Sequence, residues 1–152
     1  MKKWDILSVC DHPELIEQAA KWQSSKWSVP LQAYLDSMEE GKTAENGVPA
    51  WYVVLNEKKE IIGGIGIIEN DFHKRKDLRP NLCALYVEAA YRKQGMAKAL
   101  LDHCCERLAE NGLHTVYLCT NHTDFYERCG WSFYGMVEED GGDFCRMYQK
   151  EF

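Results

Sequence analysis

Short runs of apolar and polar positions along the chain predict strands. Five runs combine β-branched or aromatic residues with polar turns at their ends, which is typical of strands. They are "WDILSV" (4–9), "AWYVVL" (50–55), "IIGGIGII" (61–68), "LCALYV" (82–87) and "TVYLCT" (115–120). Two further runs, "WSFYGMVE" (131–138) and "FCRMYQK" (144–150), flank Asp140-Gly141-Gly142 and predict a closing hairpin.

Helical periodicity fills the segments between these strands. Asp11 as N-cap, with Pro13 in the first turn and Glu14 completing a capping box, predicts a helix that ends at Trp27. A second helix runs from Pro30 to Gly41. A third, over 95–112, carries its apolar residues at helical spacing: Ala97, Leu100, Leu101, Cys104, Cys105 and Leu108. A fourth, short helix over 122–130 ends at Gly130.

The resulting order is β-α-α-β-β-β-α-β-α-β-β, with no internal repeat or linker. This order predicts an α/β fold in which a mixed sheet carries helices on both faces. The length of 152 residues suits one domain, 1–152.

The net charge, the hydropathy and the cysteine content of the chain exclude several classes of function. The formal net charge of −6 argues against nucleic acid as a partner. No apolar run reaches the roughly 18 residues of a membrane span, and Asp5 and Asp11 interrupt the N-terminal segment, so no signal peptide is expected. Seven cysteines without a C-x-x-C pair predict free thiols in a reducing cytoplasm and no metal site.

The stretch "YRKQGMAKALL" (91–101) predicts an anion site. It leads from the strand "LCALYV" through Gly95 into the third helix, where free N–H groups and the helix dipole favour negative charge. Arg92, Lys93 and Lys98 can add charge-assisted hydrogen bonds. Neither a Walker P-loop nor a dinucleotide fingerprint is present. A plain turn with solvated basic residues is the alternative.

Two motifs give the chain a resemblance to a known family. "RKQGMA" (92–97) matches the [QR]-x-x-G-x-[GA] pyrophosphate loop of the GNAT superfamily of acyl-CoA N-acyltransferases. "NHTDFYERCGW" (121–131) resembles that family's later F-Y-x-x-x-G-[FW] segment. Since length and strand order agree as well, the resemblance covers nearly the whole chain. It implies a GNAT-like fold with a mostly antiparallel sheet that splays between the fourth and fifth strands.

The resemblance also implies a cofactor site for acetyl-CoA as cosubstrate, without a metal. Backbone groups of Leu85 and Val87 would bind the pantetheine arm, and a backbone N–H near Leu85 or Tyr86 would polarise the thioester carbonyl. Asn121 would contact the arm or cap a helix. The coenzyme A pyrophosphate would be bound by the loop and first helical turn: Arg92, Lys93, Gln94, Gly95, Met96, Ala97 and Lys98.

Tyr126 matches the tyrosine that protonates the coenzyme A sulfur in this family. The general base is less defined, because many members carry a glutamate where this chain has Asn81. Glu69, Asp71 and His73 are the candidates at the end of the preceding strand, with Glu88 as a fourth. Glu69 and Asp71 would share one strand face by period two and form a paired-carboxylate site for a cationic amine.

Acetyl transfer to a primary amine by direct attack in a ternary complex is the function that these features predict. The acceptor is expected to be a cationic small molecule or a protein amine, bound by the N-terminal helices, the long loop and the final hairpin. Aromatic residues could form its wall or simply the core: Trp22, Trp27, Tyr34, Trp51 and Tyr52. A non-catalytic acyl-CoA sensing module and a plain protein-binding domain are the alternatives, and a homodimer is compatible with the resemblance.

Overall fold

A computed structural model describes residues 4–152, and Lys2 and Lys3 of the N-terminal segment lie outside this range. Within it, seven strands form one sheet in the order β1-β2-β3-β4-β5-β7-β6. The pair β4–β5 is parallel and the other pairs are antiparallel. The predicted element order and the mixed sheet are therefore confirmed. No helix in the described range is long and apolar enough to cross a membrane.

The element bounds agree closely with the expected ones. The strands are β1 (Ile6–Ser8), β2 (Ala50–Leu55), β3 (Ile61–Ile68), β4 (Asn81–Val87), β5 (Thr115–Thr120), β6 (Ser132–Glu138) and β7 (Phe144–Glu151). The helices are α1 (Ile16–Lys26), α2 (Leu31–Gly41), α3 (Met96–Glu110) and α4 (Phe125–Arg128).

The start of the first helix differs from the prediction. Asp11 ends a 3₁₀ turn that begins at Val9, and Pro13 opens a second 3₁₀ turn. His12 between them has φ −127° and ψ 71°, which interrupts the helical path. Helix α1 begins only at Ile16 and has no side-chain cap, so the predicted capping box is wrong. Its predicted end at Trp27 is confirmed.

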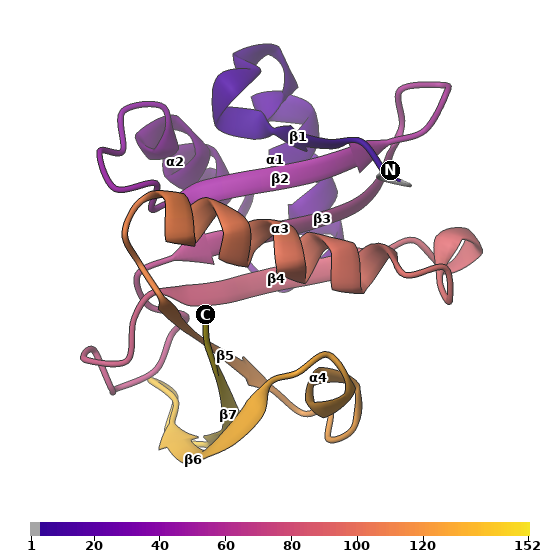
Figure 1. Ribbon diagram of the computed structural model, residues 1–152. Coiled ribbons are helices and arrows are strands. Elements are labelled where there is room, and N and C mark those ends of the chain that lie inside the picture. Colours follow the sequence, from indigo (N-terminus) through magenta and orange to yellow (C-terminus); the bar gives the residue numbers. More distant parts are fainter. Residues whose placement is uncertain (1–3) are drawn as a thin grey trace.

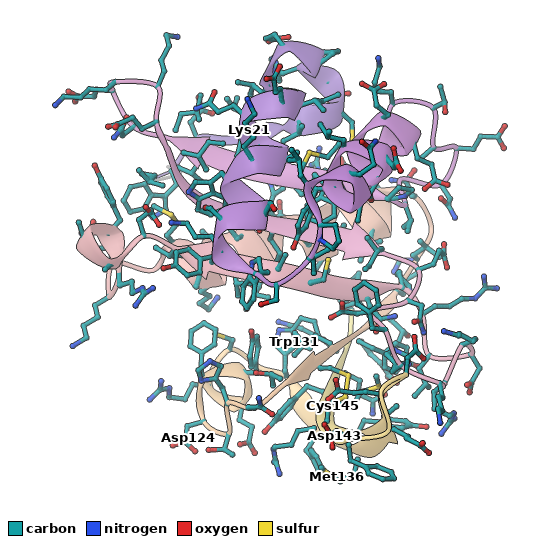
Figure 2. All side chains as sticks on the ribbon, turned by 180° about the vertical axis from the view of Figure 1, so that it is seen from behind. Lys21, Asp124, Trp131, Met136, Asp143 and Cys145 are labelled. Carbon is teal, nitrogen blue, oxygen red and sulfur yellow. A yellow bond between two sulfur atoms is a disulfide. The ribbon has the colours of Figure 1, made fainter. Side chains whose placement is uncertain are left out.

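The helices cover opposite faces of the sheet. Figure 1 shows α3 lying across β3 and β4 on the near face, with α1 and α2 behind the sheet. In the reverse view of Figure 2, α1, which carries Lys21, lies in front. One buried cluster joins α3 to the sheet through residues such as Leu100 and Leu101, and a second joins α1 and α2 to it through Ala19 and Met38. The sheet therefore separates two distinct layers of core.

Three glycines in β3 leave room for large side chains to lie against this strand on both faces of the sheet. A Cβ on Gly63 would collide with the sulfur of Met96 at the start of α3. On the other face, a Cβ on Gly64 would lie 2.8 Å from the ring of Trp22, and one on Gly66 would lie 2.5 Å from the ring of Trp51. The strand interior is thus glycine-rich because other groups occupy the space of its side chains.

Strands β4 and β5 separate after a single point of contact. Within residues 4–152 their register contains one pair, Asn81↔Tyr117, and the Tyr117 N–H also donates to Pro80 O at 3.1 Å. Beyond that point the strands diverge, and Figure 1 shows β5, β6 and β7 turned away from the β1–β4 half. The splay expected between the fourth and fifth strands is confirmed.

The expectation that the cysteines are free thiols is wrong for two of them. Cys119 on β5 forms a disulfide with Cys145 on β7, so two of the seven cysteines are not free thiols; Figure 2 labels Cys145. Their strands are neighbours in the sheet, a proximity that sequence spacing does not reveal. The other five are free: Cys10, Cys83, Cys104, Cys105 and Cys129.

Replacing Gly66 with alanine should destabilise the protein by about 1–3 kcal/mol, because the new methyl group would overlap the Trp51 ring. That ring cannot easily move, since it packs edge-on against Tyr34 and its N–H donates to Ser37 Oγ at 2.9 Å. Urea unfolding measures the loss. Gly141→Ala is the matched control, because a Cβ there meets nothing within 4 Å. Equal stability of the two variants would contradict the packing account.

Candidate active site

A bulge in β4 releases backbone groups at the point where the strands separate. The register with β3 shifts between Gly64 and Gly66, so Ala84 and Leu85 together stand opposite one residue of β3. Ala84 has φ +54°, a left-handed conformation that is unusual for a residue with a side chain. Such a bulge leaves a residue outside the ladder and re-aims the neighbouring groups.

Alternation along β4 decides which backbone groups face β5. The N–H of Glu88 donates to Ile62 on β3, so by period two the backbone groups of Tyr86 also face β3. Those of Val87 point the opposite way, toward the gap. The structure thus corrects the expectation for Tyr86, and it leaves Val87 and the bulged Leu85 facing the gap.

The gap opens into a cleft of about 440 Å³ that passes between the two halves of the sheet. On the α3 face it is lined by Leu101, Leu118 and Tyr126, and on the opposite face by α2, by the segment before it and by the loop after β3. Side chains from both faces therefore meet in one cavity.

The N-terminus of α3 has the properties of an anion site. Gly95 stands at the N-cap with φ +88°, and the helix has no side-chain cap. The first N–H groups of a helix lack intrahelical partners, so those of Met96, Ala97 and Lys98 are available to a ligand. A Cβ on Gly95 would meet nothing, so glycine is required there for its conformation and not for space.

The basic residues of this loop are partly engaged within the chain. Arg92 donates from Nε to Val87 O at 2.8 Å and lies 5.3 Å from the centre of the Tyr86 ring. Lys98 forms an ion pair with Asp102 at 2.7 Å. Lys93 and Gln94 are exposed, and Lys93 has φ +63°. Arg92 thus ties the loop to the end of β4.

Tyr126 lies in the cleft because a short, sharply terminated helix holds it there. Gly130, at φ +90°, ends α4, and the Trp131 N–H reaches back to Tyr126 O at 2.9 Å, as in a Schellman motif. The Tyr126 ring packs edge-on against Trp131. Burial raises the pKa of Tyr126 to about 12, and a hydrogen bond with Thr120 partly opposes this rise.

Asn121 also lines the cleft, and it is exposed. The N-cap of α4 is Asp124, so the alternative role of Asn121 as a helix cap is not observed.

The two carboxylates that follow β3, those of Glu69 and Asp71, lie in different surroundings. The strand ends at Ile68, so Glu69 and Asp71 do not share a strand face, and the predicted pairing of the two is wrong. Glu69 is exposed and lies 3.5 Å from Arg79. Asp71 is half-buried and lines the cleft. Burial raises the pKa of Asp71 to about 6; His73 opposes the rise and Glu139 adds to it.

His73 and Asn81 serve to anchor the loop. His73 is fully buried, and its Nε2 lies 2.9 Å from Asn81 Oδ1. Asn81 donates from Nδ2 to Glu69 O at 2.8 Å and to Leu78 O at 2.9 Å. The amide of Asn81 is therefore fully used, and it fixes the loop that carries Asp71. Glu88, the fourth candidate base, forms an ion pair with Lys26 at 2.6 Å.

Gln23 is a site residue that the sequence does not single out. It is 1% exposed and donates from Nε2 to Ala84 O, the carbonyl of the bulge, at 3.3 Å. Its Oε1 accepts from Trp27 Nε1 at 3.1 Å. The available signal was a polar residue beside the apolar stripe of α1.

Comparison with known proteins identifies the fold. The model of the acetyltransferase (GNAT) family matches residues 14–131. The chain belongs to the GNAT family. The resemblance seen in "RKQGMA" and "NHTDFYERCGW" is thereby confirmed.

Solved GNAT structures share this architecture over nearly the whole chain. An aminoglycoside 6'-N-acetyltransferase complexed with coenzyme A superposes with a TM-score of 0.72 at 19% identity, covering 97% of this chain and 96% of that chain. An aminoglycoside 6'-acetyltransferase type Ii gives 0.69 at 20% identity with the same coverage. A GNAT acetyltransferase from Streptococcus pneumoniae gives 0.65 at 15% identity, covering 97% and 100%. No curated protein matches significantly in sequence.

Asp71→Asn should raise the melting temperature at pH 8 and leave it unchanged at pH 4. Burial raises the pKa of Asp71 from 3.8 to about 6, so the folded protein loses stability as the pH rises through this range. The loss amounts to at most about 3 kcal/mol. Thermal unfolding at both pH values measures it.

Asp77→Asn is the control on the same loop. Hydrogen bonds from Arg75 lower the pKa of Asp77 to about 2, so its removal should not stabilise the protein at pH 8. A stabilisation by Asp71→Asn that is equal at pH 4 and pH 8 would contradict the assignment.

Proposed function

We propose that this chain is an acetyl-CoA-dependent N-acetyltransferase that transfers an acetyl group to a primary amine by direct attack in a ternary complex. The supporting observation is the cleft between β4 and β5, which Tyr126, the β4 bulge and Asp71 line together. Acetyl-CoA supplies the activated acyl group. The remaining steps belong to residues of this chain.

The N-terminus of α3 would hold the pyrophosphate through the N–H groups of Gly95, Met96 and Ala97, with Lys93 adding positive charge. The outward-facing backbone groups of Leu85 and the Val87 N–H would bind an extended amide-bearing arm as a neighbouring strand would, while the Val87 carbonyl already accepts from Arg92. The fit rests on the uncapped helix start and on the unpaired edge of β4.

The Leu85 N–H would polarise the thioester carbonyl. In a planar trans peptide the carbonyl and the following N–H point in opposite directions. Because Gln23 on α1 holds the Ala84 carbonyl, the Leu85 N–H is directed away from α1. Gln23 is thus a positioning residue for a donor that stabilises the developing oxyanion.

Proton handling divides between Asp71 and Tyr126. Asp71, with a pKa of about 6, is a stronger base than an ordinary aspartate and would accept a proton from the amine, directly or through water. Tyr126, with a pKa of about 12, stays protonated and would donate to the sulfur as negative charge develops on it. A free thiol has a pKa of about 8.5, below that of Tyr126. The tyrosine would therefore stabilise the leaving thiolate by donating a hydrogen bond while it keeps its proton.

Direct attack is favoured over an acyl-enzyme route by the state of Cys83. This free thiol lines the cleft, but burial raises its pKa well above the usual value. Since the thiolate is the nucleophilic form, Cys83 is poorly suited to accept an acyl group.

Tyr126→Phe should lower kcat by roughly 10²-fold, the usual cost of one lost donor to transition-state charge. Binding of acetyl-CoA should persist. At about 100 times its Kd a ligand stabilises the fold by about 2.7 kcal/mol, so the thermal shift with acetyl-CoA, measured against adenosine alone, should equal that of the wild type.

Three other outcomes are informative. A fully active Tyr126→Phe variant would remove Tyr126 from the mechanism. A thermal shift without turnover of any amine by the wild type would favour a non-catalytic acyl-CoA-binding module. The absence of any shift with acetyl-CoA would overturn the proposed function.

Gln23→Leu should lower kcat about tenfold or more while the acetyl-CoA thermal shift stays at the wild-type value, because the Leu85 N–H loses its fixed direction. Steady-state kinetics and thermal shift measure the two effects. Gln18→Leu, an exposed glutamine of the same helix, is the matched control. Equal losses of kcat and acetyl-CoA affinity in Gln23→Leu would indicate a merely structural role.

A further inference from the structure

The α1–α2 side of the cleft has an aromatic floor. Tyr34 and Trp51 line it, are 5% and 3% exposed, and pack edge-on with ring centres 5.5 Å apart. The Trp51 indole N–H is already used, because it donates to Ser37 Oγ at 2.9 Å. The Trp51 ring therefore offers a ligand mainly carbon surface.

Two further rings stand exposed at the edge of the same region. Trp27 is 39% exposed and Phe72 is 57% exposed, and both line the cleft. The Trp27 N–H is satisfied by Gln23, so this ring too presents mainly apolar surface. Exposed aromatic rings around a cavity indicate a binding surface for an apolar group.

The conformation of Phe72 costs energy that the surrounding structure offsets. Its φ is +60°, a left-handed conformation that is strained for a bulky residue and seldom adopted by one. The Asp140 N–H donates to Phe72 O at 2.8 Å, and the flanking His73 pairs with Glu139 in an isolated bridge. The β6–β7 hairpin thus holds an apolar ring at the cleft against its local preference.

The charge of the region is low. Among the described residues that line the cleft, Asp71 is the one carboxylate. Glu139 acts on the pKa of Asp71 but does not line the cleft. Four other carboxylates on this loop and the facing hairpin are paired with basic side chains: Glu69 with Arg79, Asp77 with Arg75, Glu138 with Lys74 and Asp140 with Lys76. Asp143 in the hairpin turn is exposed and does not line the cleft.

We infer that the acceptor is a monoamine whose single ammonium group faces Asp71 and whose aryl or alkyl body lies among Trp27, Phe72, Tyr34 and Trp51. This inference rests on the proposed acetyltransferase function and names its acceptor class. Because the lining supplies one carboxylate, a molecule with several ammonium groups would leave all but one of them without a charged partner, which is costly. Polyamines and aminoglycosides are therefore disfavoured acceptors, although aminoglycoside acetyltransferases share the fold.

The first test compares kcat/KM at saturating acetyl-CoA for four amines. The monoamines 2-phenylethylamine and tryptamine should exceed spermidine and kanamycin by at least about tenfold, since unpaired polar groups reduce transition-state binding strongly. Turnover of kanamycin or spermidine equal to or above that of the arylalkylamines would overturn the inference and leave the proposed function standing.

The second test removes the exposed ring. Phe72→Ala should raise KM for 2-phenylethylamine about tenfold, with little change in KM for methylamine and no change in the acetyl-CoA thermal shift. Phe144→Ala is the matched control, because that ring is 60% exposed and does not line the cleft. An equal effect of Phe72→Ala on both amines would contradict a contact between the ring and the acceptor body.

A binding measurement tests the proposed acceptor class independently of catalytic turnover. Saturation-transfer NMR on the Tyr126→Phe variant with coenzyme A should show contact between the protein and the aryl protons of 2-phenylethylamine, and Phe72→Ala introduced into this variant should weaken it. No transfer would overturn the acceptor class. If transfer is seen but the wild type acetylates no amine, the proposed function fails, and the result supports only the binding of a monoamine with an aryl body at this site.

Discussion

The parallel contact between β4 and β5 at Asn81 and Tyr117 is the constraint on which the rest of the structure depends. Had the ladder continued, the backbone groups of Leu85 and Val87 would be used within the sheet and no cleft would pass through it. Because it stops, two strand edges face each other across a cavity. Backbone N–H and C=O groups at such edges need partners, and an extended ligand with amide groups can supply them.

The two faces of the sheet then contribute different chemistry to one cavity. The α3 side brings Leu101 and Tyr126, and the α1–α2 side brings aromatic rings and, from the loop after β3, Asp71. Gln23 connects them, since it reaches from α1 to the bulge carbonyl. Gln23 can reach the bulge because Gly64 has no side chain and leaves room for Trp22 and Gln23 against the strand.

Much of the fold could be predicted from local pattern. Strands β2, β3 and β5 have the predicted bounds, and the glycine turn into α3 and the segment around Tyr126 identified the family. The predictions that failed concern segments whose structure is set by tertiary contacts and not by local sequence. Asp11 could form a cap in isolation, but the chain breaks at His12. The disulfide depends on a strand neighbour distant in sequence.

The candidate site was predictable only in part for the same reason. Glu69 and Asp71 look equivalent in sequence, yet the end of β3 sends one to Arg79 and the other into the cleft. The role of Gln23 requires knowing that Ala84 is bulged and that its carbonyl faces α1, which no residue pattern states.

The side-chain amide of Asn81 has hydrogen-bond partners on both its oxygen and its nitrogen, and this restricts which residues can replace it. Both of its donated hydrogen bonds end on carbonyl oxygens, those of Glu69 and Leu78, so a carboxylate there would face two acceptors with nothing to donate. A glutamate at position 81 would therefore require a different path for the loop before β4, and the buried His73 would lose the amide oxygen beside its Nε2. Positions 73 and 81 thus form one unit, and a change at either calls for a change at the other.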